Sequence, residues 1–227
     1  MLKNEEKLYQ CEGWKATNRI GALAEMHHIF NENYNELISF INQFRNNEHP
    51  EKIYYFEAMS HLTRYIFNFL SAAFALRDNC RKIMANYDNT LFKNDYQNKI
   101  KIFDCNLAYF VQDLRNYQSH YKIEMPNLIK NTDISNSHDF VYLSQDFLQH
   151  SEQLSAKGKQ YIDECGDEIS IYNIIVQYHQ LTNELYNWLY SAFLDYHRND
   201  LEEKKQIIKE LKLENDIAEI EHFLTTK

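Results

Sequence analysis

Glycine and proline are scarce in this chain, with four glycines and two prolines among 227 residues. This composition leaves too little turn chemistry for a sandwich or barrel built from many short strands. The sequence also lacks a glycine-rich phosphate-binding loop, which argues against a P-loop or Rossmann nucleotide site. We therefore expect helices to dominate, and the 44% hydrophobic content is enough to build a substantial core.

Cysteine is sparse as well, and its four occurrences lie far apart at Cys11, Cys80, Cys105 and Cys165. Because no Cys-x-x-Cys pair occurs, neither a zinc knuckle nor a disulfide framework is indicated, and we expect reduced, mostly buried thiols. Charged residues interrupt every apolar run well before the roughly 18 residues of a membrane span, and the N-terminus lacks the apolar core of a secretion signal. These absences predict a cytoplasmic protein with no membrane partner.

The net charge of −9 has the wrong sign for a typical nucleic-acid partner, because backbone binding depends on Lys and Arg. The charge is unevenly distributed, however. Residues 64–130 carry 10 basic and 6 acidic side chains, whereas residues 131–227 carry 8 basic and 18 acidic ones. The middle of the chain is therefore a basic segment, which is either a solvated face without a partner or a surface for an anion.

Apolar residues recur at a spacing of three to four residues, which predicts long amphipathic helices at 14–44, 53–83, 91–121 and 170–196. Asp88 and Asn89 are expected to end the second helix, and Pro126 prevents a long extension of the third.

The remaining segments are expected to be shorter elements. We expect a helix at 155–164, after a loop rich in turn-forming residues with a short strand at Phe140–Leu143. The tail at 200–227 is dense in Glu and Lys with a thin apolar stripe, so it is expected to pack on the body or on a partner.

The third helical stretch ends in a polar block, Arg115-Asn116-Tyr117-Gln118-Ser119-His120. In one interpretation Arg115 and His120 are solvated residues near a helix C-terminus, where a cation is mildly favourable against the helix dipole. In the other interpretation the block is a site. For a chain with 10 histidines and few arginines, the number of Arg-Asn-x-x-x-His matches expected by chance is on the order of a few hundredths, so the one match found here is informative.

With Pro126 a few residues further on, this block resembles the signature of the HEPN superfamily (higher-eukaryote and prokaryote nucleotide-binding domain). The helix from Ile174 to Trp188 is also similar to a bacterial branch of these proteins, and the likeness extends over residues 51–193. The resemblance implies an all-α, HEPN-like bundle of four or more long helices. This single domain would span residues 1–199, including an additional N-terminal helix, and residues 200–227 would form a charged helical appendage.

The resemblance further implies a metal-independent endoribonuclease that needs no cofactor. In such an enzyme the RNA 2′-hydroxyl attacks the adjacent phosphate and leaves a 2′,3′-cyclic phosphate and a 5′-hydroxyl. His120 suits general acid or base catalysis, since the ordinary pKa of imidazole is about 6.5. Arg115 offers a permanently charged planar fork for the phosphorane, and Asn116, at i,i+4 from His120, could orient the ring or the phosphate.

Further RNA contacts are expected from four residues, each with a structural alternative. Tyr117 and Tyr121 would stack on bases or simply pack. Arg77 and Arg81 in the basic segment would guide the RNA backbone, or else form salt bridges with neighbours such as Asp78.

Five residues separate Arg115 from His120, which places them about 140° apart on a regular helix. A C2 homodimer would bring both side chains from two chains into one shared cleft, as is typical of the family. The expected role is a bacterial toxin or an anti-phage effector, with a protein antitoxin or regulator as a possible partner.

Two rival interpretations remain. Glu25-x-x-His28 and Glu219-x-x-His222 have the spacing of ligands in a di-metal helical bundle, although the second pair lies in the charged tail. Alternatively, the chain is a catalytically inert HEPN-like module that acts by binding as a scaffold, regulator or antitoxin partner. The acidic C-terminal third suits such a role.

Overall fold

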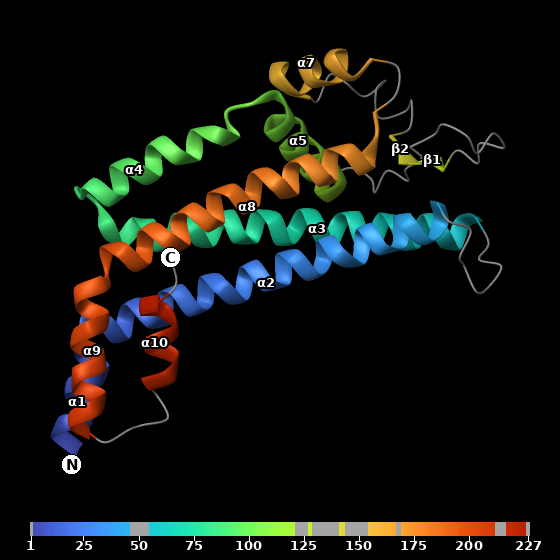
Figure 1. Ribbon diagram of the computed structural model, residues 1–227. Helices are drawn as coiled ribbons and strands as arrows, with labels where there is room; N and C mark the ends of the chain where they lie inside the picture. The colour runs from blue at the N-terminus through green and yellow to red at the C-terminus, as the bar shows by residue number, and fades with distance from the viewer. Residues whose placement is uncertain are drawn as a thin grey trace. The chain divides into compact units, whose positions relative to one another are not determined.

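The computed structural model describes residues 2–45, 55–120, 127–128, 141–143, 154–166, 169–211 and 217–225, without the side chains at 2–5, 44–45, 55–56, 118–120, 127–128, 141–142 and 217–219. The described chain is predominantly α-helical, with two short 3-10 helices and one pair of two-residue strands (Figure 1). The all-α class predicted from the scarcity of glycine and proline is therefore confirmed.

The elements follow in the order α1 (Leu2–Gln10), α2 (Glu12–Arg45), α3 (Tyr55–Met84), the 3-10 helix η1 (Ala85–Tyr87), α4 (Leu91–Lys99), the 3-10 helix η2 (Ile100–Phe103), α5 (Asn106–His120), β1 (Asn127–Leu128), β2 (Val141–Tyr142), α7 (Ala156–Cys165), α8 (Ile171–Tyr196), α9 (Arg198–Leu211) and α10 (Ile217–Thr225). The helices expected at 14–44, 155–164 and 170–196 are confirmed as α2, α7 and α8. The strand expected at Phe140–Leu143 is β2, which pairs antiparallel with β1.

The end of α3 follows the expected stop signal. The helix tightens into η1, and Asn89 then adopts a positive φ of 66°, a conformation that asparagine tolerates better than most residues. Thr90 starts the next helix, because its hydroxyl oxygen accepts a hydrogen bond from the backbone N–H of Lys93 at 3.1 Å.

The prediction of a single helix at 91–121 is wrong. α4 ends at Lys99, and α5 begins at Asn106 after η2 and a turn closed by a hydrogen bond from the Asp104 N–H to the Lys101 carbonyl at 2.8 Å. No glycine or proline marks this break, so the apolar periodicity runs through it. The Asp104 carboxylate accepts a hydrogen bond from the Tyr109 hydroxyl at 3.2 Å and pairs with Lys157 of α7. Contacts with a distant helix thus stabilise the turn.

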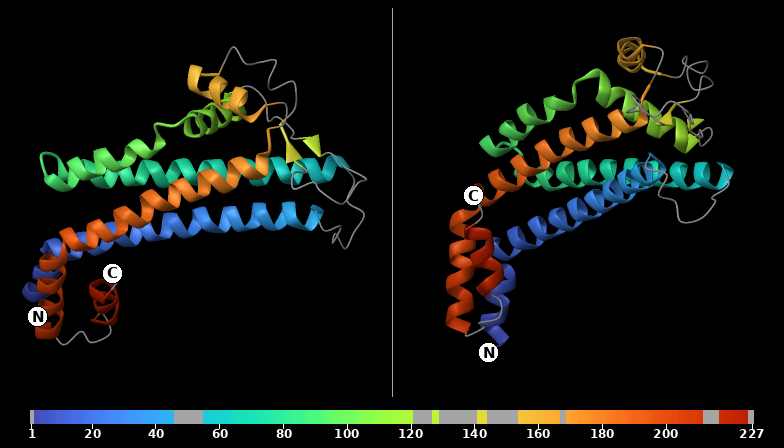
Figure 2. Two further views of the ribbon diagram at one scale, coloured as in Figure 1. Left: turned by 45° about the horizontal axis from the view of Figure 1, so that its top comes forward. Right: turned by 45° about the vertical axis from the view of Figure 1, so that its right-hand side comes forward.

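The chain forms two compact units. Unit 1 comprises Met1–His27, Leu76–Lys99 and Glu184–Lys227. In it, α9 lies beside α1 and α10 packs on α9 (Figures 1 and 2). A buried cluster joins these helices, made by Leu8, Ile207, Ile208 and Ile220, with Cys11, Trp14, Leu211 and Leu224 partly buried against it. The tail thus contains two helices within unit 1, and the domain boundary placed between residues 199 and 200 stays a prediction.

Gly13 lets α2 and α9 approach closely within unit 1. A Cβ atom at this position would lie 2.7 Å from the Cβ of Lys204 and closer still to the carbonyl oxygen of Asp200. Beside this contact Lys204 is buried, with its ammonium donating to the Thr17 hydroxyl at 2.9 Å and lying 4.8 Å from the centre of the Trp14 ring.

Unit 2 comprises His28–Ala75 and Ile100–Asn183. Its largest fully buried side chains come from α2, α3, α5 and α8, and they include Phe30, Leu37, Leu62, Ile66, Phe69, Phe110 and Tyr178. α7 packs along α5, where Phe110 and Tyr161 stack with ring centres 5.1 Å apart.

All four cysteines are free thiols, but only Cys80 is buried, while Cys11, Cys105 and Cys165 are half-buried. The expectation of mostly buried thiols is therefore wrong for three of the four, which lie near helix ends rather than in a helix interior. None of the helices that the structure describes combines the length and apolarity needed to cross a lipid bilayer.

Candidate functional site

The candidate site lies on the last turns of α5, in unit 2. One face of this helix is buried and consists of Ala108, Phe110, Val111, Leu114 and Tyr117. Arg115 lies on the opposite, exposed face, and Asn116 is half-buried between the two faces. The amphipathic pattern of the sequence therefore presents the motif arginine to solvent while anchoring the helix that carries it.

Contacts with Phe74 and Asn116 help to position the Arg115 guanidinium. Its centre lies 5.4 Å from the centre of the Phe74 ring on α3, and Nη1 donates a hydrogen bond to Asn116 Oδ1 at 3.3 Å. An aromatic ring attracts a cation at this distance, and at an exposed position the attraction is about 0.5–1 kcal/mol. The two residues of the motif that the structure describes in full are thus in contact.

Asp113, two residues before Arg115, fastens α7 to α5. Its Oδ2 accepts hydrogen bonds from the Ser155 N–H at 2.9 Å and from the Ser155 hydroxyl at 2.7 Å. The same Ser155 oxygen caps α7 by accepting from the Gly158 N–H at 3.1 Å. Gly158 allows this approach, because a Cβ there would overlap Asp113 Oδ2. The second helix therefore braces the segment that carries Arg115.

The other predicted site residues lie in different environments. His120 is the last residue of α5, but its side chain is not described, and Tyr121 lies outside the described residues. Tyr117 is only 7% exposed, which favours packing over base stacking.

Arg77 and Arg81 lie on the part of α3 that belongs to unit 1, whereas Arg115 belongs to unit 2. Arg77 is half-buried. Arg81 is exposed and forms an ion pair with Asp78, which is the alternative to RNA binding that the sequence left open.

Sequence reasoning missed a buried hydrogen-bond chain in unit 1. The Tyr87 hydroxyl lies 2.7 Å from Nε2 of His197, and Nδ1 of His197 lies 2.6 Å from the Asp200 carboxylate. Arg19 donates to the Tyr87 oxygen at 3.2 Å. Since a carboxylate only accepts, Nδ1 of His197 donates to Asp200, and in the neutral imidazole Nε2 then accepts from the Tyr87 hydroxyl.

The centre of this hydrogen-bond network is buried, since Tyr87 is 5% and His197 4% exposed. Burial raises the pKa of Tyr87, and the neighbouring Arg19 opposes the rise. No local sequence signal identifies this network, because Tyr87 and His197 are 110 residues apart. We interpret it as a structural network.

Comparisons with protein-family models, with curated proteins and with solved structures gave no match. The likeness to HEPN proteins therefore rests on the sequence resemblance alone.

The rival interpretation as a di-metal bundle requires a cluster of metal ligands. Among the side chains that the structure describes, no group of three or more His, Cys, Asp or Glu residues could hold a metal ion. Glu25 and His28 lie one turn apart on α2 and are both exposed, and the side chain of Glu219 is not described.

Proposed function

We propose that this protein is a metal-independent endoribonuclease of the HEPN class that works as a homodimer, in the role of a bacterial toxin or an anti-phage effector. The observation that carries the proposal is the exposed Arg115 at the end of α5, held over Phe74 and against Asn116. A guanidinium fixed on one side and exposed to solvent on a braced helix is suited to contact a phosphate.

The proposed reaction needs two proton transfers and one anionic transition state. A bond forms between the RNA 2′-oxygen and the adjacent phosphorus while the bond from phosphorus to the 5′-oxygen breaks. One group accepts the 2′-hydroxyl proton, and a second group donates a proton to the departing 5′-oxygen. Arg115 stabilises the charge on the phosphorane.

A dimer supplies the second acid–base group. One His120 can hold only one of the two roles within a single turnover, whereas two chains paired at the ends of α5 provide two His120 rings and two Arg115 side chains. The angular separation of Arg115 and His120 on one helix favours the same arrangement.

The decisive assay is RNA cleavage in EDTA by the wild type, Arg115→Ala and His120→Ala. In the homodimer His120→Ala removes both acid–base groups and Arg115→Ala removes both phosphorane contacts, so each variant should lower the rate by at least about 10²- to 10⁴-fold. Arg64→Ala is a matched control, since Arg64 is also exposed in unit 2, with its guanidinium centre 4.8 Å from the centre of the Tyr65 ring. His61→Ala controls for loss of a partly exposed histidine.

Mixing the two inactive variants tests the shared cleft. A mixed dimer of Arg115→Ala and His120→Ala retains one arginine and one histidine, so part of the activity should return. Wild-type protein that cuts no RNA at any salt or protein concentration would refute the nuclease proposal, and cleavage that requires a divalent metal would refute the mechanism. In cells, growth arrest on induction should disappear with His120→Ala.

The inert binding module remains the second candidate function, and one charge observation favours it. The paired state of Arg81 and the 18 acidic side chains of residues 131–227 both reduce the surface available to RNA. An intact protein without nuclease activity that binds a protein partner through its acidic third would support this candidate.

A further inference from the structure

A groove in unit 1 lies between α4 and α8, apart from the residues proposed for RNA cleavage. It has a volume of about 470 Å³ and is lined by Asp95, Asn98 and Lys99 of α4 and by Trp188 and Ala192 of α8. This volume lies in the range of small-molecule sites, which runs from about 300 to 1,000 Å³.

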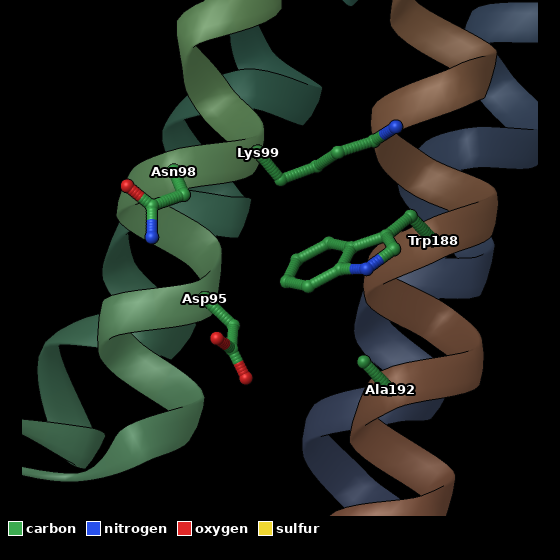
Figure 3. A pocket seen from close by; sticks show the side chains of 5 residues that line it. All are labelled: Asp95, Asn98, Lys99, Trp188 and Ala192. Atoms are coloured by element: carbon green, nitrogen blue, oxygen red, sulfur yellow. The ribbon is translucent and has the colours of Figure 1, made fainter.

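The indole of Trp188 forms one wall of the groove. Figure 3 shows the ring extending from α8 toward α4, with the Lys99 chain crossing above it and the Asp95 carboxylate on the opposite helix below it. Ala192, one turn after Trp188, is small and leaves the space beside the ring open. An indole that is only half-buried presents a π face to whatever enters this space.

The charges around the groove leave one carboxylate available. The Lys99 ammonium is paired with Glu184 at 2.6 Å, which neutralises both groups. Asp95 is exposed, and its carboxylate makes no hydrogen bond or ion pair with the described part of the chain. The groove therefore combines an aromatic face with an unpaired negative charge.

The apolar surface continues toward the end of α8. Trp188, Ala192 and Tyr196 follow at four-residue intervals and share one face of the helix. Tyr196 is 47% exposed and stacks on Phe92 of α4 at a centre-to-centre distance of 5.0 Å. A ligand bound beside Asp95 can therefore extend an apolar stem over Ala192 toward Tyr196.

We propose that this groove binds a small organic cation with a planar guanidinium head on an apolar stem. The planar head stacks on the Trp188 indole and donates two parallel hydrogen bonds to the Asp95 carboxylate. A guanidinium is weakly hydrated and matches a carboxylate in a fork geometry, whereas an ammonium does neither as well. A phosphate or carboxylate ligand is disfavoured, because Asp95 repels it and Lys99 is already paired.

The two tryptophans of the chain allow a direct test with butylguanidinium as the probe. In a Trp14→Phe background, the emission of Trp188 should change saturably with millimolar butylguanidinium at constant ionic strength. Butylurea, a neutral compound of the same shape, should give no saturable change. Asp95→Asn should weaken binding by about tenfold or more, since it removes the charge and keeps the side-chain volume. Asp195→Asn, which removes an exposed carboxylate on α8 outside the groove, should leave binding unchanged.

A second measurement covers the case in which Trp14→Phe perturbs the fold, since Trp14 contacts the buried Lys204. In the wild type, one of the two indole N–H signals in an NMR titration should shift with butylguanidinium, and in Asp95→Asn the same shift should require about tenfold more of the probe or be lost. The proposal is overturned if neither measurement responds, if butylurea or butylammonium binds as well as butylguanidinium, or if Asp95→Asn binds normally. None of these outcomes depends on whether the protein cleaves RNA.

Discussion

Replacing Gly13 by alanine should destabilise unit 1 by forcing apart two helices that touch through their backbones. The new Cβ would lie 2.7 Å from Lys204 Cβ and 2.9 Å from the carbonyl carbon of Asp200. Neither obstacle is the flexible end of a side chain. α9 must therefore move away from α2, which weakens the buried contacts of Lys204 with Thr17 and Trp14.

Two opposing terms set the magnitude of this effect. Alanine favours a helix over glycine by about 1 kcal/mol at most. Overpacking against rigid atoms costs up to about 3 kcal/mol. We therefore expect Gly13→Ala to lower the free energy of unfolding by about 2 kcal/mol, which corresponds to a fall in Tm of about 4–8 °C for a protein of this size.

Gly21→Ala is the matched control on the same helix. Apart from its chain neighbours and the backbone of its own helix, no described atom lies within 4 Å of the position that its Cβ would occupy, so only the helix preference remains. This variant should gain about 0.5–1 kcal/mol. The two alanine variants should thus shift in opposite directions.

Urea unfolding followed by circular dichroism and by tryptophan fluorescence measures both variants. A shift of the midpoint with an unchanged slope reports stability alone, and coincidence of the two signals tests two-state behaviour. If Gly13→Ala were as stable as the wild type, the close approach of α2 and α9 would not exist as described.

Three other substitutions probe contacts that the fold creates. Gly158→Ala should cost about 1–3 kcal/mol in urea unfolding, because the added methyl displaces the Asp113 carboxylate from the cap of α7. Tyr87→Phe should cost about 1–3 kcal/mol, because the buried hydrogen bond between Tyr87 and Nε2 of His197 is lost. Burial raises the pKa of the Cys80 thiol from 9.0 to about 12. Between these values only the unfolded thiol ionises, so the free energy of unfolding should fall as the pH rises above about 9, by up to about 1.4 kcal/mol per pH unit, and Cys80→Val should fall less steeply.

Each of these predictions has a control and a contrary outcome. Tyr109→Phe removes a hydroxyl whose bond to Asp104 is exposed, so its cost should be smaller than that of Tyr87→Phe. Equal costs would argue against a buried Tyr87 network. An unchanged stability of Gly158→Ala would contradict the capping contact, and identical alkaline slopes for the wild type and Cys80→Val would contradict the buried thiol.

The candidate site was predictable only in its local part. The motif from Arg115 to His120 and its place at a helix end follow from apolar spacing and residue identity, which are properties of adjacent residues. Two other features of the site cannot be read from adjacent residues: the Phe74 ring under Arg115 and the hydrogen bond between Asp113 and Ser155 that braces α5. Each joins segments about 40 residues apart. Such contacts depend on how helices pack, and the apolar periodicity of one sequence does not specify which residues of two helices face each other.

The sequence by itself determined that the chain is helical, because a three- to four-residue apolar spacing and a scarcity of turn formers act within one or two helical turns. It also determined approximately where the segment containing α3 and η1 stops, before Asn89, and where α7 starts, after Ser155. Only the tertiary structure decided the break between α4 and α5, the buried network around His197 and the groove between Asp95 and Trp188. These features depend on side chains from separate helices, and their positions follow from packing rather than from local preference.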